Sequence, residues 1–184
     1  MISEKKVTET KTIQTINDLV NSLSEGERTK FDKIFRSIDI PKNEFDQFCS
    51  WSNESYTRNC IIETDSFELI LLCWEKGQVT AIHDHGGEEC WVYAIDGPFK
   101  EVIFSKKSET EMSQQKSTHI KQGGITFMVD FIGFHRLENT SDERSMSLHL
   151  YAKPIRSCQV FDEETSEFIT KELAYNTIFD EAQS

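Results

Sequence analysis

The sequence predicts a mainly β fold, an antiparallel sandwich or jelly-roll barrel, preceded by α-helices. Two observations indicate it. Short runs rich in β-branched and aromatic residues, divided by turn sequences and not by helices, fill residues 56–165 approximately. The part before them, about 12–50, places apolar residues at helical spacing. A length of 184 residues suits a single domain that contains both parts.

Helices account for the first part. In TIQTINDLVNSL the apolar residues that share one helical face are Ile13, Ile16, Leu19, Val20 and Leu23. GERTKFDKIFRSI has the same pattern in Phe31, Ile34, Phe35 and Ile38. Pro41 can begin a third short helix, which carries Phe45 and Phe48.

Strands account for the second part. The predicted strands are RNCIIE, FELILLCW, CWVYAI, KEVIFS, GITFMV and SMSLHLYA, with EKGQ, DHGG, DGP and QGG as turns. SKKSETEMSQQKST is expected to be a polar connection at a long hairpin tip. The final segment, SEFITKELAYNTIFDEAQS, fits a strand or a helix equally well.

Composition excludes several classes of function. A net charge of −12 disfavours nucleic acid and anionic membranes as partners, since both need a basic surface. No apolar run approaches the ~20 residues that span a bilayer, and the N-terminus lacks the apolar core of a signal peptide. Five cysteines, an odd number without a C-x-x-C pair, favour a reducing, cytoplasmic setting over a disulfide framework or structural zinc.

His83 and His85 form the first candidate site. Residues i and i+2 on a strand point to one face, with Cα atoms roughly 6.5–7 Å apart, so both imidazoles could bind one ion. Two solvent-facing histidines at a strand end would give the same pattern. The pair alone does not decide between these interpretations.

The spacing around the pair favours a metal. Gly77, the HDH sequence, Cys90 and Gly97 are spaced as in the first motif of the cupins. Most cupins have a glutamate ligand where this chain has Cys90, and alternation points the adjacent Glu89 to the opposite face. A second block, GITFMVDFIGFHRLEN, has the spacing of the second cupin motif.

That second block supplies His135 and Asn139, and it has Asp130 where the motif usually has proline. Two motifs in the right order are much more specific than either one. We therefore expect His83, His85 and His135 to bind a metal ion.

Two further stretches have a polar face. In SMSLHLYAKP one face carries Ser145, Ser147, His149 and Tyr151, and the other carries Met146, Leu148 and Leu150. In YTRN, Tyr56 and Arg58 share a face. A strand with one solvated face, and an arginine on the surface at a strand start, are the simpler interpretations of each stretch alone.

Together, YTRN, CW before a glycine turn, HDHGGEEC, IGFHRLEN and SLHLYAKP resemble the cysteine dioxygenases of the cupin superfamily. The resemblance covers residues 12–165 approximately. It implies one Fe(II) per chain on His83, His85 and His135, with L-cysteine and O2 as substrates and cysteine sulfinic acid as product. It also implies a monomeric enzyme of cysteine catabolism, on the route to taurine and sulfite.

The resemblance also implies roles for other residues. Cys90 would form a thioether cross-link with Tyr151, whose hydroxyl Ser147 and His149 would orient. The family commonly continues with Ser-Pro-Pro and a cis bond after this tyrosine, whereas this chain has Ala152-Lys153-Pro154. The conformation of that loop is therefore left open.

Substrate binding is implied for Arg58, which would hold the carboxylate, and for Tyr56 in the same pocket. Cys158 falls near the expected entrance.

A dioxygenase for another small thiol, such as 3-mercaptopropionate, is an alternative, although relatives with that preference tend to lack both this arginine and Cys90. A second alternative is a metal-binding cupin without catalysis. Three histidines also suit zinc, so iron is expected from the oxidation chemistry and not from the ligands alone.

Overall fold

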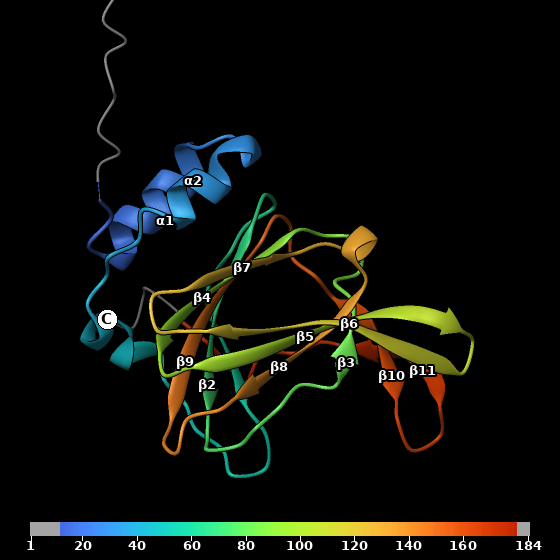
Figure 1. Ribbon diagram of the computed structural model, residues 1–184. Coiled ribbons are helices and arrows are strands. Elements are labelled where there is room, and N and C mark those ends of the chain that lie inside the picture. Colours follow the sequence, from blue (N-terminus) through green and yellow to red (C-terminus); the bar gives the residue numbers. More distant parts are fainter. Residues whose placement is uncertain (1–11, 180–184) are drawn as a thin grey trace, which may run out of the picture.

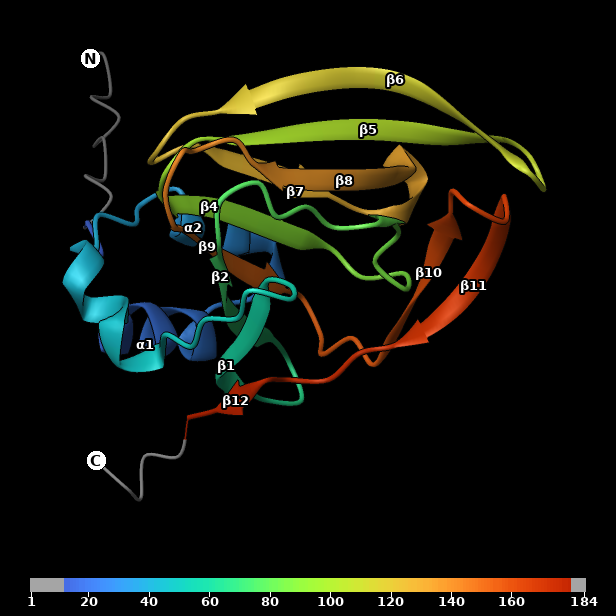
Figure 2. The ribbon, with the colours of Figure 1, turned by 90° about the horizontal axis from the view of Figure 1, so that it is seen from below.

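Two six-stranded sheets pack face to face in the computed structural model, which describes residues 12–179 (Figures 1 and 2). The first sheet has the order β12 (Thr177–Ile178), β1 (Thr57–Glu63), β2 (Glu68–Trp74), β9 (Ser145–Tyr151), β4 (Cys90–Asp96) and β7 (Ile125–Met128). The second has the order β11 (Glu167–Glu172), β10 (Ser157–Asp162), β3 (Ile82–His83), β8 (Phe134–Asn139), β5 (Phe99–Ser108) and β6 (Glu111–Ile120). All neighbours are antiparallel except β12 and β1, so the predicted fold class is confirmed.

The N-terminal part is helical, as predicted, and its elements are α1 (Ile16–Glu25), a 3₁₀ turn (Arg28–Lys30), α2 (Phe31–Phe35) and a 3₁₀ helix (Lys42–Phe48). Thr15 caps α1 by accepting the Asp18 N–H at 3.1 Å, which ends the extended chain at that point. Ile13 and Ile38 therefore lie outside the helices and pair in an isolated β-bridge. Within residues 12–179 no helix is long and apolar enough to cross a membrane.

Alternation along the first sheet divides the apolar residues into two cores. One core lies between the sheet and the helices, which cover its outer face (Figure 2), and it takes Met146, Leu148 and Leu150 from β9. The other lies between the two sheets and takes Tyr151 from the same strand. The two faces predicted for SMSLHLYA are thus confirmed, and its polar face lines the interior of the barrel instead of meeting solvent.

Gly97 makes the turn between β4 and β5 possible. Its φ of 83° lies in the left-handed region, where glycine is strongly favoured. A Cβ at this position would lie 2.0 Å from Oγ of Ser145, at the start of β9. The last glycine of the first motif is therefore required by both the turn and the strand packing.

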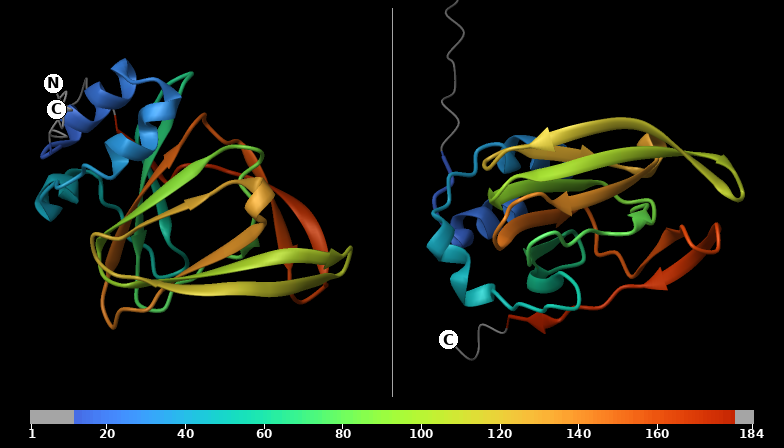
Figure 3. Two further views of the ribbon diagram at one scale, coloured as in Figure 1. Left: turned by 45° about the horizontal axis from the view of Figure 1, so that its top comes forward. Right: turned by 60° about the horizontal axis from the view of Figure 1, so that its bottom comes forward.

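The segment SKKSETEMSQQKST is strand and not loose connection, because β5 and β6 form one long hairpin (Figures 2 and 3). Its mostly polar side chains face solvent, so the alternation that marks a half-buried strand is missing. The final segment forms β11 and β12, and the sheets thus continue beyond residue 165. Residues 180–184 of that segment lie outside the described part.

Candidate metal centre

The three predicted ligands meet inside the barrel. His83 of β3 lies directly opposite His135 of β8 in the antiparallel register, and His85 follows β3 by two residues. One nitrogen from each ring lies within 4.8 Å of the other two. The ring centroids are 4.7 Å apart for His83–His135 and His85–His135, and 5.4 Å apart for His83–His85. Three imidazoles at these separations can bind one ion.

His85 reaches this position from a loop and not from the strand that we expected. β3 ends at His83, so strand alternation does not orient the second histidine. Asp130 does so instead: its Oδ1 accepts the backbone N–H of His85 at 2.9 Å, and its Oδ2 accepts that of Gly87 at 2.6 Å. The residue that replaces the usual proline of the second motif thus positions the ligand loop.

The protonation of the three histidines suits metal binding. Nδ1 of His83 lies 2.9 Å from the carbonyl oxygen of Ala81, and Nδ1 of His135 lies 2.8 Å from a carboxylate oxygen of Glu101, which leaves both Nε2 atoms for a metal. Burial holds the pKa of each of the three histidines below its usual value, so they are neutral near pH 7, the state that binds metals. Nδ1 of His85 is buried without a hydrogen-bond partner in residues 12–179. The donor set therefore fits a resident metal ion.

Glu101 contacts Nδ1 of His135, the ring nitrogen that is not left for the metal. The two side chains are 3% and 2% exposed, and Oε2 of the carboxylate also accepts the Thr126 hydroxyl at 2.6 Å. A carboxylate behind a histidine ligand fixes the orientation of the ring and raises its basicity. Glu101 is not among the residues predicted from the sequence, although KEVIF places a glutamate on the face of β5 that packs inward beside Phe99.

Replacing Glu101 by Gln should weaken metal binding by about 10- to 100-fold, the usual cost of losing an outer-shell partner of a ligand. The amide keeps the shape of the side chain but removes the negative charge next to the imidazole. A competition titration against a chromophoric chelator measures the affinity directly, without turnover.

Thr126→Val is the matched control, because it removes one hydroxyl donor to the same carboxylate but leaves the negative charge in place, and it should cost less. Equal metal affinity in the wild type and in Glu101→Gln would show that Glu101 merely fills space.

Across the interior from the histidines, β9 carries a connected polar row. The indole N–H of Trp74 donates to the Ser147 hydroxyl at 2.9 Å, and that oxygen lies 2.8 Å from Nε2 of His149. Because the indole can only donate, the Ser147 proton is free to go to His149. The rings of Tyr151 and His149 have centroids 6.5 Å apart, and that of Tyr151 is 6.0 Å from that of His85. The row therefore reaches the metal centre.

Cys90 lies directly opposite Tyr151 on the neighbouring strand. Both residues are buried, at 0% and 3% exposed, and burial raises the pKa of the Cys90 thiol. Glu89 instead forms an ion pair with Arg28 at 2.8 Å near the surface, as strand alternation predicts. The thiol and the phenol are thus neighbours inside the barrel, while the carboxylate beside them belongs to the exterior.

Arg58 also points into the barrel. Its side chain is 12% exposed, and Nη2 lies 3.5 Å from Oε1 of Glu68, a fully buried carboxylate that is not among the site residues predicted from the sequence. Burial opposes its charge, but Tyr151 and Glu68 outweigh burial and raise the pKa of Arg58. Nε of Arg58 is buried without a hydrogen-bond partner in the described residues. The guanidinium therefore retains a free donor for a ligand.

The ring of Tyr56 stacks on that of Trp74, with centroids 4.7 Å apart. Cys158 is buried on β10. The loop that follows Tyr151 contains only trans peptide bonds, as does all of residues 12–179, so Ala152-Lys153 takes the ordinary isomer.

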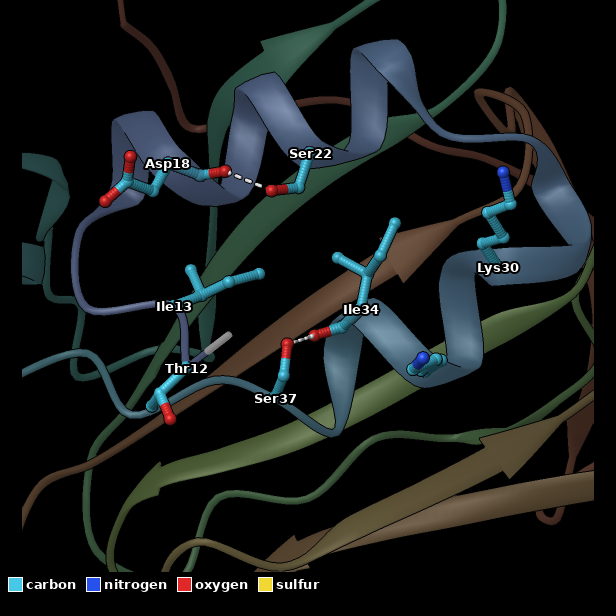
Figure 4. A pocket seen from close by; sticks show the side chains of 8 residues that line it. Thr12, Ile13, Asp18, Ser22, Lys30, Ile34 and Ser37 are labelled. Atoms are coloured by element: carbon cyan, nitrogen blue, oxygen red, sulfur yellow. Dashed lines mark hydrogen bonds between the residues drawn. The ribbon is translucent and has the colours of Figure 1, made fainter. Parts of the chain in front are cut away.

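A cavity of about 280 Å³ lies elsewhere, between α1 and α2 (Figure 4). Its Ser22 and Ser37 hydroxyls donate to backbone carbonyls of Asp18 and Ile34. None of the predicted site residues lines it. The chemistry therefore belongs to the barrel interior.

The chain combines two packed antiparallel sheets with three histidines that converge in the interior, and the two motif blocks supply these histidines. This combination defines a metal-binding cupin. Comparison with known proteins makes the class more specific. The family model for cysteine dioxygenase type I matches residues 1–164. The chain belongs to this family.

The curated relatives carry the name of the same family. Cysteine dioxygenase type 1 of Danio rerio is 28% identical over 173 residues, which are 88% of this chain and 86% of the relative. The protein of the same name from Rattus norvegicus is 30% identical over 162 residues, or 83% and 81% of the two chains. A Klebsiella pneumoniae protein with a double-stranded β-helix domain has a TM-score of 0.48 and 21% identity, covering 58% of this chain and 80% of its own.

Proposed function

We propose that this protein is a cysteine dioxygenase, which uses one Fe(II) per chain to add both atoms of O2 to the sulfur of L-cysteine and releases cysteine sulfinic acid. The observation that carries the proposal is the meeting of three neutral histidines, a buried arginine and a buried tyrosine in one interior. Membership of the family, and relatives named cysteine dioxygenase type 1, support the same reaction.

His83, His85 and His135 would hold the iron, and their neutrality leaves its positive charge for a substrate thiolate. When bound, Fe(II) supplies the redox chemistry with O2 that zinc lacks, and it favours the thiolate form of the substrate. A facial carboxylate ligand, common in other oxygenases, would repel that thiolate.

The remaining residues would bind and orient the substrate. Arg58 can pair with the carboxylate through parallel N–H donors, a geometry that lysine cannot reproduce. The Ser147–His149 hydrogen bond fixes the imidazole beside Tyr151, which would place the phenol over the substrate. The ring stack of Tyr56 and Trp74 would form an aromatic wall beside the substrate.

We expect a thioether between Sγ of Cys90 and a ring carbon of Tyr151, formed with the loss of two hydrogens when O2 oxidises the pair in the iron-loaded protein. Their direct opposition on β4 and β9 supports this expectation. The tether should remove rotamer freedom worth about 1 kcal/mol. Cys90→Ala should therefore slow turnover by roughly fivefold, with iron content unchanged.

Peptide mass spectrometry should find the two segments joined after turnover with L-cysteine. Cys158→Ala is a control, because that thiol lies on another sheet and should leave the joined peptide intact. If Cys90 still alkylates fully after many turnovers, no cross-link forms.

The setting of the enzyme follows from the same features. All five cysteines are free, which fits the reducing cytoplasm. We expect the enzyme to be a monomer. Such an enzyme would act in the breakdown of cysteine, on the route to taurine and sulfite.

Oxygen uptake tests the proposal. Iron-loaded protein should consume one O2 for each L-cysteine, with cysteine sulfinic acid as product, and zinc-loaded protein should consume none. Faster uptake with 3-mercaptopropionate than with L-cysteine would identify a dioxygenase for another thiol. No uptake with either thiol would identify a non-catalytic metal-binding cupin.

A further inference from the structure

Glu68 is a fully buried carboxylate inside the barrel that the proposed reaction does not use. It is the first residue of β2, and its side chain is 0% exposed. The backbone register places it directly opposite Tyr151 of β9, which lies opposite Cys90 of β4 on its other side. Directly opposite residues of antiparallel neighbours point to one face of a sheet. Glu68 therefore belongs to the same inward row as the tyrosine.

Each oxygen of the Glu68 carboxylate has one hydrogen-bond partner. Oε2 accepts the backbone N–H of Ile155 at 3.0 Å, and Oε1 lies 3.5 Å from Nη2 of Arg58, a long contact for a hydrogen bond. Arg58 keeps a buried Nε without a partner in residues 12–179. One guanidinium thus faces a resident carboxylate and still has a donor for a second one.

We propose that Glu68 is a specificity-determining residue, which competes with the carboxylate of the substrate for Arg58 and so limits how tightly carboxylate-bearing thiols bind. The inference rests on the proposed function, which makes the ligand a thiol with a carboxylate. Without substrate, Glu68 compensates the buried charge of Arg58, which would otherwise be costly. With substrate, two carboxylates approach one guanidinium, and their repulsion offsets part of the attraction. A thiol without a carboxylate escapes this competition.

Glu68→Gln tests the competition, because the amide keeps the size of the side chain and an acceptor for Ile155 but removes the charge. Anaerobic titrations of iron-loaded protein with L-cysteine and with cysteamine give two dissociation constants without turnover. The constant for L-cysteine should fall roughly tenfold, equivalent to about 1.4 kcal/mol, while that for cysteamine should change less than about twofold.

Glu63→Gln is the matched control. Glu63 lies directly opposite Glu68 on β1 but pairs with Arg156 near the surface, so its loss should not separate the two thiols. Weaker or unchanged binding of L-cysteine to Glu68→Gln, or equal changes for both thiols, would overturn the inference.

A second comparison is needed if Glu68→Gln fails to fold because the buried Arg58 charge has lost its counter-charge. In Arg58→Gln the Glu68 charge faces the substrate carboxylate alone, and in the double variant Arg58→Gln/Glu68→Gln neither charge remains. The double variant should bind L-cysteine more tightly than Arg58→Gln and bind cysteamine equally well. Equal binding of L-cysteine by both would overturn the inference.

Measurements on the wild type distinguish a failure of the proposed function from a failure of the role proposed for Glu68. A wild-type protein that neither binds nor oxidises L-cysteine overturns the proposed function and this inference with it. A wild-type protein that oxidises L-cysteine, but whose affinity is indifferent to Glu68, overturns this inference alone.

Discussion

His135→Ala is expected to strip most of the metal from the protein and to remove nearly all activity. The residue is 2% exposed, and its Nδ1 lies 2.8 Å from a carboxylate oxygen of Glu101, which holds the ring in its position beside the other two histidines. Loss of an outer-shell partner costs about 10- to 100-fold in metal affinity, and loss of a ligand itself should exceed the upper end of that range. Two remaining imidazoles would compete poorly with a chelator.

Metal content by elemental analysis, after dialysis against a weak chelator, measures the effect without reference to turnover. His119→Ala is the matched control, since His119 lies exposed on β6 and should leave both metal and activity intact. Thermal unfolding of both variants without metal should match that of the metal-free wild type within a few degrees. Full metal occupancy in His135→Ala would remove this residue from the ligand set.

The meeting of the three candidate ligands could be predicted from the sequence because each motif combines local spacing with local structure. His83 and His135 lie at strand positions whose alternation points them inward, and their pairing follows from the antiparallel order of β3 and β8. The same alternation correctly divides β9 into an apolar face under the helices and a polar face inside the barrel. Strand periodicity thus predicts which face of the sheet a side chain occupies. The spacing of the motif predicts which other side chains lie near it.

What could not be predicted depends on contacts between segments far apart in the chain. Glu68 and Glu101 look like ordinary charges of half-buried strands, and only the packing of the two sheets makes both of them interior. Asp130 departs from the motif, but its use as an acceptor for the ligand loop appears only when residues 85–87 fold against it. Alternation also failed for His85, because the strand stops two residues earlier than the pattern suggests.

Arg58→Gln should separate substrates by their carboxylate. L-Cysteine offers a thiol, an amine and a carboxylate, whereas cysteamine lacks the carboxylate. In the interior of the barrel a charge-assisted hydrogen bond to Arg58 should contribute about 1.5–3 kcal/mol. Its removal should lower kcat/KM for L-cysteine by roughly 10- to 150-fold and should barely change kcat/KM for cysteamine, which we expect to be a poor substrate of the wild type.

The variant has a structural cost that the design of the experiment must separate from substrate recognition. Arg58→Gln leaves the buried Glu68 carboxylate without its counter-charge, and breaking a buried pair in this way typically costs about 3–5 kcal/mol of stability. The assays therefore need a temperature well below the unfolding midpoint of the variant, and equal iron content in both proteins. Arg144→Gln provides the control, since Arg144 pairs with Glu75 at the surface.

The comparison of the two thiols then decides what Arg58 does. A selective loss for L-cysteine assigns the guanidinium to the carboxylate, because both thiols share the metal centre, the tyrosine and any instability of the variant. Equal losses for both thiols would mean that Arg58 supports the fold or the metal centre and does not bind the carboxylate. No loss for either would mean that the pocket binds its substrate without this arginine, even though Arg58 points into the barrel.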